Sequence, residues 1–163
     1  MTDIHGMPGH LIRRLNQIST SVFAERMERE GLDCTPVQYA ALATIAKRPD
    51  IDQASLAGLI AYDRATLGNV VERLDRKGLV ARQVCPQDRR SRQLRLTSQG
   101  ERMLDRLKPV VEDLQNDILS GLSESETDSL MALLRKATTI GNARSRAPVL
   151  ADTGKTRARK EEA

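Results

Sequence analysis

The stretch DQASLAGLIAYDRATLGNVVERLDRKGLV, residues 52–80, decides the fold of this chain. Asp52 is suited to cap a short helix over 53–60, and Asp63 is suited to cap a longer one over 64–77. Apolar residues recur at helical spacing along the longer helix, and a glycine follows its end. Two helices with a short break between them, the second flanked by positive charge, predict a helix-turn-helix.

The residues that follow change from helical to alternating periodicity. The ranges 79–84 and 92–97 read as strands, and Leu94 and Leu96 share one face of the second strand. Residues 86–90 supply a polar turn rich in arginine. The sequence therefore predicts a β-hairpin with a basic tip, which is the wing of a winged helix-turn-helix.

Amphipathic helices are expected on both sides of this unit. A helix over 9–30 ends at Gly31, and a helix over 36–47 begins with the capping sequence Thr35, Pro36 and Gln38. Thr97 caps a long helix over 98–120 with a heptad seam at 104–118, in which Pro109 should introduce a kink or free a carbonyl.

The last predicted helix begins at a second capping box formed by Ser123 and Glu126. Its apolar positions are Leu130, Leu133, Leu134, Ala137 and Ile140.

Composition agrees with a mainly α protein that carries a small β-hairpin wing. Charged residues make up 29% of the chain and aromatic residues 2%, which disfavours an all-β fold or a large aromatic cleft. We expect a winged helix-turn-helix embedded in a helical dimerisation domain. The expected parts are a flexible arm (1–8), a dimerisation helix (9–34), the DNA-binding domain (35–97), dimerisation helices (98–143) and a disordered basic tail (144–163).

Several classes of protein are disfavoured by what the sequence lacks. No apolar stretch approaches the roughly 18 residues of a membrane span, and the start of the chain lacks a signal-peptide pattern, so a cytoplasmic protein is expected. Cys34 and Cys85 are too few for a disulfide framework and lack metal-ligand spacing, so neither a metal nor a cofactor is expected. Both histidines lie in the first ten residues, without a catalytic constellation, so the chain is not expected to be an enzyme.

Charge is distributed unevenly along the chain, whose formal net charge is +4. Residues 63–95 contain nine basic and four acidic side chains, whereas residues 96–143 contain five basic and eight acidic ones. A basic middle segment on a scaffold of opposite sign is typical of a nucleic-acid-binding protein, although a charge-rich solvated surface would also produce clusters.

Three segments resemble the MarR family of bacterial regulators: DQASLAGLI (52–60), YDRATLGNVVERLDRKGLV (62–80) and PQDRRSRQLRLTSQG (86–100). The third, with its Asp-x-Arg wing tip and Leu-Thr-x-x-Gly, is the most specific. PGHLIRRLNQIS and TPVQYAAL also resemble a subgroup associated with aromatic and nicotinate-type catabolism. The resemblance implies an obligate homodimer that binds a near-palindromic operator in double-stranded DNA, usually represses transcription, and is released by small aromatic anions.

The predicted DNA contacts lie on helix 64–77, on the wing 85–92 and at the start of the preceding helix. Arg90 matches the family's wing-tip arginine and is expected in the minor groove, whereas Asp88 is expected to hold Arg90 or Arg73 in place. Arg73 could instead bind phosphate, and Arg64 could be merely solvated. The full set is Gln53, Ser55, Arg64, Thr66, Asn69, Arg73, Arg89, Arg90 and Arg92.

The resemblance to the MarR family implies an effector site in the crevice between the dimerisation helices and the DNA-binding lobe. An arginine there could hold a ligand carboxylate, with a ring beside it. The candidates are His10, Arg13, Arg14 and Tyr39. Arg13 and Arg14 could equally form salt bridges between subunits, and His10 could be a surface residue.

Two other functions remain open at this stage. Cys34, just before a predicted helix, or Cys85 in the wing could sense oxidants, because a helix N-terminus can lower a thiol pKa. A coiled-coil adaptor could use the seam at 104–118, but that reading leaves the basic wing unexplained.

Overall fold

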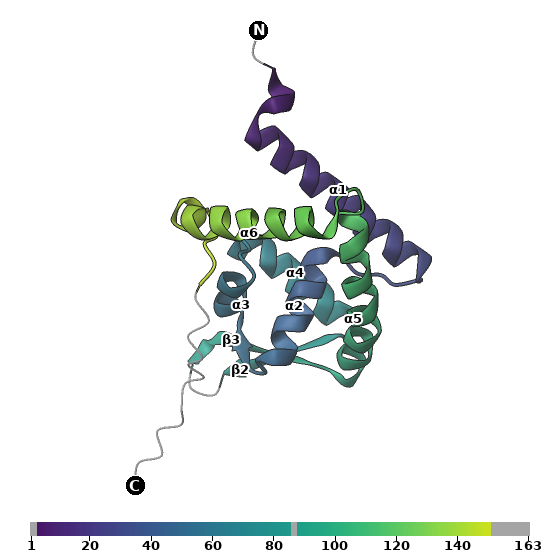
Figure 1. Cartoon of the computed structure of the whole chain (residues 1–163). Coiled ribbons are helices and arrows are strands. Elements are labelled where there is room, and N and C mark those ends of the chain that lie inside the picture. Colours follow the sequence, from purple (N-terminus) through teal and green to yellow (C-terminus); the bar gives the residue numbers. More distant parts are fainter. Residues whose placement is uncertain (1–2, 86–87, 151–163) are drawn as a thin grey trace.

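The computed structural model describes residues 3–85 and 88–150, and the side chains of residues 85 and 88–91 lie outside that description. Over these residues the chain is mainly helical and carries a small antiparallel sheet (Figure 1). The helices are α1 (Pro8–Arg29), α2 (Pro36–Lys47), α3 (Gln53–Leu59), α4 (Arg64–Arg76), α5 (Ser98–Ile118) and α6 (Glu124–Gly141), with 3-10 turns η1 (Ile4–Gly6) and η2 (Asn142–Arg144). The strands are β1 (Ile51–Asp52), β2 (Val80–Cys85) and β3 (Asp88–Leu96).

The helix-turn-helix forms where the capping residues predict it. The Asp52 carboxylate accepts a hydrogen bond from the Ser55 amide at the start of α3, and the Asp63 carboxylate accepts from the first-turn amides of α4. Between them Ala61 has a φ of 53°, a left-handed conformation that ends α3 and turns the chain toward α4. Local hydrogen-bonding chemistry therefore fixes both ends of this motif.

The sheet contains one strand more than the predicted hairpin. Its order is β1-β3-β2, and β1 pairs with β3 so that Ile51 lies opposite Leu94. Strands β2 and β3 form the wing, with a register shift between Val84 and Cys85 near its tip. The short third strand ties the base of the wing to the segment before α3.

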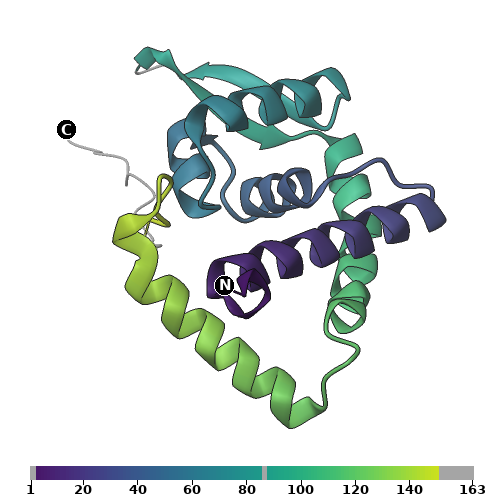
Figure 2. The ribbon, with the colours of Figure 1, turned by 90° about the horizontal axis from the view of Figure 1, so that it is seen from above.

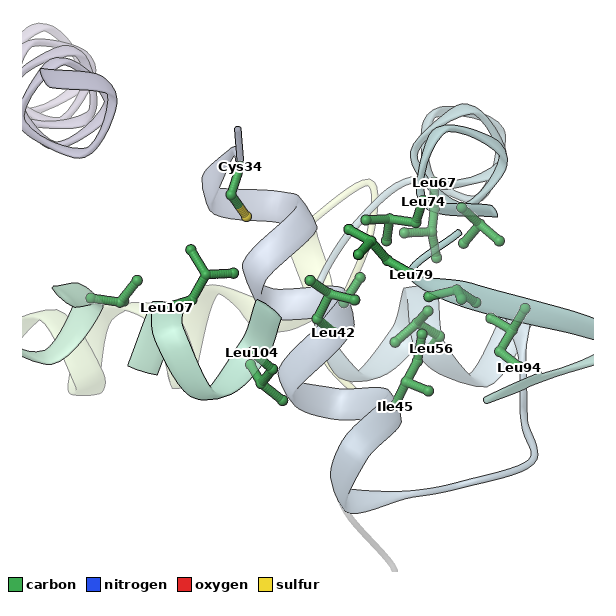
Figure 3. Close-up of a cluster of buried hydrophobic side chains, with 14 of the residues drawn as sticks. Cys34, Leu42, Ile45, Leu56, Leu67, Leu74, Leu79, Leu94, Leu104 and Leu107 are labelled. Atoms are coloured by element: carbon green, nitrogen blue, oxygen red, sulfur yellow. The ribbon is translucent and has the colours of Figure 1, made fainter. Parts of the chain in front are cut away.

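Aliphatic side chains from the helix-turn-helix, the sheet and α5 form one core (Figure 3). Leu42 of α2, Leu56 of α3 and Leu67 of α4 are fully buried, as are Leu94 of the wing and Leu107 of α5. Burial of a leucine side chain contributes roughly 1.5–3 kcal/mol, so this core stabilises the winged helix-turn-helix within a single chain.

A close contact joins the end of α4 to the start of α5. The Thr97 hydroxyl donates to the Gly78 carbonyl and accepts from the Gly100 amide. A Cβ at position 100 would lie 2.0 Å from the Leu79 carbonyl oxygen, so only glycine fits there. Helix α5 then continues through Pro109 to Ile118.

Helix α6 runs along one edge of the molecule (Figure 2), and both it and α1 leave apolar side chains exposed. Only Phe23 and Met27 of α1 are buried, and no residue of α6 is. Ile12, Leu133 and Ile140 are 63%, 64% and 73% exposed. The C-terminal half of α1 is held on α5 by Arg26, which forms ion pairs with Asp113 and Asp117.

Both ends of the described chain contain local hydrogen bonds. The predicted arm contains the turn η1, because the Asp3 carboxylate caps it through the His5 amide. The tail expected to be disordered from residue 144 instead contacts the rest of the chain as far as Leu150, whose amide donates to the Gly58 carbonyl. Residues 151–163 lie outside the described part.

Candidate nucleic-acid interface

Helix α4 divides into a buried apolar face and an exposed polar face. Leu67, Val71 and Leu74 are fully buried against the core. The predicted DNA contacts of this helix all lie on its exposed surface: Arg64, Thr66, Asn69 and Arg73. Because Thr66, Asn69 and Arg73 follow each other at spacings of three and four, they share one face. The side opposite the core thus presents a row of hydroxyl, amide and guanidinium groups to solvent.

Thr66 carries a second role that the sequence interpretation missed. Its hydroxyl and amide both donate to the Asp63 carboxylate, at 2.5 and 2.9 Å. These hydrogen bonds, with a smaller effect of the Arg146 charge, lower the pKa of Asp63. The hydroxyl proton of Thr66 is therefore used within the cap, and its oxygen lone pairs are what it can offer to DNA.

The start of α3 lies beside α4, but its polar groups are partly used within the protein. The Ser55 hydroxyl donates to Asp52 at 2.7 Å. Burial alone would raise the pKa of Asp52, but the hydrogen bonds from the Ser55 hydroxyl and backbone amides lower it. Gln53 is half-buried, and its side-chain amide lies close to α4. A Cβ at Gly68 would be 3.3 Å from the Gln53 Nε2 atom.

The wing brings further basic groups beside α4. Arg92 is exposed on β3. The backbones of Asp88, Arg89 and Arg90 continue β3 to its tip, while their side chains lie outside the described residues. The expected support of Arg90 or Arg73 by Asp88 therefore stays a prediction.

Other wing arginines are held by acids that the sequence interpretation did not identify. Arg95 of β3 forms a two-contact ion pair with Asp50, and this hydrogen bonding lowers the pKa of Asp50. Arg82 of β2 lies 3.9 Å from Asp75 of α4. Among the side chains that the structure describes, Arg73 forms no ion pair with an acid. The pairing of Asp50 with Arg95 spans 45 positions, so no local pattern could reveal it.

The four predicted effector residues do not form one site within a single chain. The His10 ring nitrogen lies 3.5 Å from the Arg13 guanidinium, which also donates to Gln17 at 2.8 Å. Arg14 is exposed on the same helix. Tyr39 is half-buried on α2, where burial and the nearby Glu112 of α5 raise its pKa. His10 and Arg13 are thus brought together, whereas Tyr39 faces α5.

An open depression of about 390 Å³ lies between α2, β3 and α5. None of the predicted effector residues lines it. Its lining consists of Ala46, Pro49, Arg95, Leu96, Glu101, Leu104, Asp105 and Lys108.

Cys34 does not have the environment of a reactive thiol. It is buried, and this burial raises the pKa of its thiol from 9.0 to about 11. A thiol with that pKa is almost entirely protonated at neutral pH, which disfavours oxidant sensing through Cys34. The side chain of Cys85 lies outside the described residues.

Two further properties concern the described part of the chain only. No helix within it combines the length and the hydropathy needed to cross a membrane. No group of three or more histidine, cysteine, aspartate or glutamate side chains within it is placed to hold a metal ion.

Comparisons with known proteins place this geometry among transcriptional regulators. The MarR family model matches residues 34–91. The chain is 35% identical over 127 residues to transcriptional regulator HosA of Escherichia coli O111:H-, covering 78% of this chain and 91% of HosA. These relatives are described as regulators rather than enzymes.

Solved structures of regulators share the fold. The PcaV regulator of Streptomyces coelicolor, solved with its natural ligand, has a TM-score of 0.77 at 31% identity over 85% of this chain and 96% of that one. BpsR of Bordetella bronchiseptica, described as regulated in its DNA binding by 6-hydroxynicotinic acid, has a TM-score of 0.78 at 26% identity, covering 85% and 97%. A cysteine-to-serine mutant of E. coli MarR, complexed with operator DNA, has a TM-score of 0.74 at 27% identity, covering 83% and 99%.

Proposed function

This chain belongs to the MarR family of transcriptional regulators, and from that premise we propose that it is a homodimeric repressor of a near-palindromic operator. The proposal depends on the exposed polar face of α4, which packs against the basic wing through β2, on a lobe with its own core. The likeness to a MarR structure bound to operator DNA supports it. Repression, rather than activation, is the family's usual mode.

The proposed dimer is built by α1, α5 and α6, which belong to the expected dimerisation regions 9–34 and 98–143. Apolar side chains of α1 and α6 remain in water in one chain, and Leu133 and Ile140 are more than half exposed. A second copy of the chain would cover these side chains. The two lobes would then bind the two halves of one operator.

The proposed contacts divide into groove reading and phosphate binding. Helix α4 enters the major groove, where Asn69 and the Thr66 oxygen reach base edges or phosphates. Arg64 and Arg73 bind phosphates on either side, and Gln53 with the Ser55 region contacts the backbone from α3. At the wing, Arg90 enters the minor groove while Arg89 and Arg92 bind phosphates.

We further propose that a small aromatic acid releases the protein from DNA. PcaV with its natural ligand and BpsR with 6-hydroxynicotinic acid are the similar proteins that support a small-molecule effector. His10, Arg13 and Arg14 of α1 offer charge for a carboxylate, and Tyr39 offers a ring. Since one chain does not bring Tyr39 to the others, the proposed crevice is completed only in the dimer.

A mobility-shift titration tests the proposal. Labelled DNA from upstream of the gene should bind more tightly than a random duplex at physiological ionic strength, with affinity falling steeply as salt rises. Aromatic acids added to the complex should release the DNA. An equal affinity for both duplexes would contradict operator recognition, and no salt-dependent binding at all would favour the adaptor function instead.

A further inference from the structure

The segment 142–150, here called the docked segment, folds back from the end of α6 onto α3. The Asn142 side chain closes it into a loop, because its amide nitrogen donates to the Val149 carbonyl at 3.0 Å and its oxygen accepts from the Val149 amide at 2.8 Å. The next amide, that of Leu150, donates to the Gly58 carbonyl at 2.9 Å. Figure 2 shows this segment beside α3, on the side of the molecule opposite α5.

A glycine within α3 provides the contact surface for this segment. A Cβ at position 58 would lie 2.3 Å from the Leu150 Cδ1 atom and 2.5 Å from its Cγ atom. Glycine inside a helix costs about 1 kcal/mol relative to alanine, so its presence in α3 needs a physical reason. The Leu150 side chain, 52% exposed, lies in the space that a Cβ at position 58 would occupy.

The docked segment carries positive charge to the start of α4. It contains Arg144 and Arg146, both exposed, and no acidic residue. Arg146 lies within the loop that the Asn142–Val149 hydrogen bonds close, and this loop is joined through Leu150 to Gly58 of α3, the helix packed against α4. In keeping with this placement, the Arg146 charge makes a small contribution to the lowered pKa of Asp63. The docked segment thereby carries an exposed guanidinium on the side of α3 from which the chain enters α4, the helix that enters the groove under the proposed function.

We propose that the docked segment is an additional DNA-binding element, in which Arg146 binds a backbone phosphate beside the start of α4. The inference rests on the proposed function, because it presumes that α4 faces DNA. A guanidinium suits this role, since its planar fork matches two phosphate oxygens. Anchoring by Asn142 and Leu150 reduces the entropy lost on binding, which a free arginine-bearing chain end would lose in full.

The test measures how the affinity of the full-length dimer for a random-sequence duplex depends on salt. A random duplex is suitable because phosphate contacts do not depend on sequence. Each lost contact lowers the slope of log K against log salt concentration by about 0.9, so Arg146→Ala should lower it by roughly two for the two subunits. The wild-type protein is measured first, and if it does not bind DNA, the proposed function itself fails.

Two kinds of variant separate the arginine's charge from its placement. Arg106→Ala removes an exposed positive charge from α5, on the opposite side of the molecule, and should leave the slope unchanged. Leu150→Ala keeps both arginines and the amide hydrogen bond but removes the side chain that lies against Gly58, so it should lower the slope in the same direction as Arg146→Ala and by a smaller amount. Gly58→Ala places a Cβ where the Leu150 side chain lies, so it should lower the slope in the wild-type chain and have a smaller effect in the Leu150→Ala chain.

The outcomes decide the matter. Equal slopes for Arg146→Ala and Arg106→Ala, with wild-type binding intact, would overturn the inference and leave the proposed function standing. A lower melting temperature of Arg146→Ala with an unchanged slope would mean that this arginine only stabilises the cap of α4. A reduced slope for Arg146→Ala but not for Leu150→Ala would show that docking does not position it, which also overturns the proposal.

Discussion

The winged helix-turn-helix and the flanking helices α1 and α6 differ in how far a single chain buries their apolar side chains. In the former, Leu56, Leu67 and Leu94 are fully removed from water. In the latter, α6 has no buried residue, and Leu133 and Ile140 lie largely in solvent. Apolar surface left exposed on this scale marks an interaction surface. The winged helix-turn-helix therefore buries its core within one chain, whereas the helices beside it would be covered only in the proposed dimer.

Substitutions in the exposed apolar face of α6 should have the largest effect on assembly and operator binding. Leu133→Asn combined with Ile140→Asn would place polar groups in the proposed dimer interface, and the protein should become monomeric in sedimentation equilibrium. Affinity for a full operator should then fall by roughly a hundred-fold or more, because linkage of two binding units commonly contributes 10²–10⁴. Asp128→Asn on the same helix is the control. A double variant that stays dimeric would refute the assignment of α6.

The second largest effect is expected from a substitution at the close contact between Gly100 and the Leu79 carbonyl. Gly100→Ala would force a Cβ to within 2.0 Å of the Leu79 carbonyl oxygen, whereas a Cβ at Gly121 would meet nothing within 4 Å. Overpacking of this kind costs about 1–3 kcal/mol, so the denaturant midpoint of Gly100→Ala should fall clearly while that of Gly121→Ala stays near wild type. Equal midpoints would mean that the contact relaxes without cost.

Removing the wing-tip arginine should separate DNA binding from assembly. Arg90→Ala should weaken operator binding by about 1–3 kcal/mol, which is about 5- to 150-fold, because a groove contact is lost. The dimer mass should not change, since the wing belongs to the unit whose core one chain buries. Wild-type affinity for this variant would reject the assignment of the wing.

Acid should weaken the winged helix-turn-helix through its caps, with the smallest effect of the four. Hydrogen bonds hold the pKa of Asp52 below its ordinary 3.8, outweighing the opposing effect of burial. A carboxyl with a lowered folded pKa contributes stability that is fully present above its unfolded pKa and lost as pH falls through the folded value. The melting temperature should therefore be steady down to about pH 5 and fall below pH 4. Asp52→Asn should show a shallower fall, and an unchanged acid profile would contradict the role of this cap.

The sequence reached most of the fold because its signals are local. Thr35 with Gln38, Asp63, and Ser123 with Glu126 mark helix starts through side chains that bind amides in the same turn. Strand β1 escaped detection because two residues, Ile51 and Asp52, show no periodicity and gain their partners only from β3.

The parts of the site that could not be predicted depend on contacts between residues far apart in the sequence. The ion pair of Asp50 with Arg95 and the docking of Leu150 on Gly58 join residues far apart in the chain. Exposure of Arg64, Asn69 and Arg73 follows from helical spacing, and the structure confirms it. What these residues touch in DNA remains a prediction.

The contact between Gly100 and the Leu79 carbonyl has a mechanical consequence. With no room between them, and with the Thr97 hydroxyl bound to Gly78, the first turn of α5 cannot pivot freely against the end of α4. In a dimer whose subunits meet along α5, a tilt of that helix would move the winged helix-turn-helix together with it, as one rigid unit. The distance between the two α4 helices of the dimer would then depend on how the C-terminal ends of the α5 helices pack. That distance determines the spacing of operator half-sites that the dimer can bind.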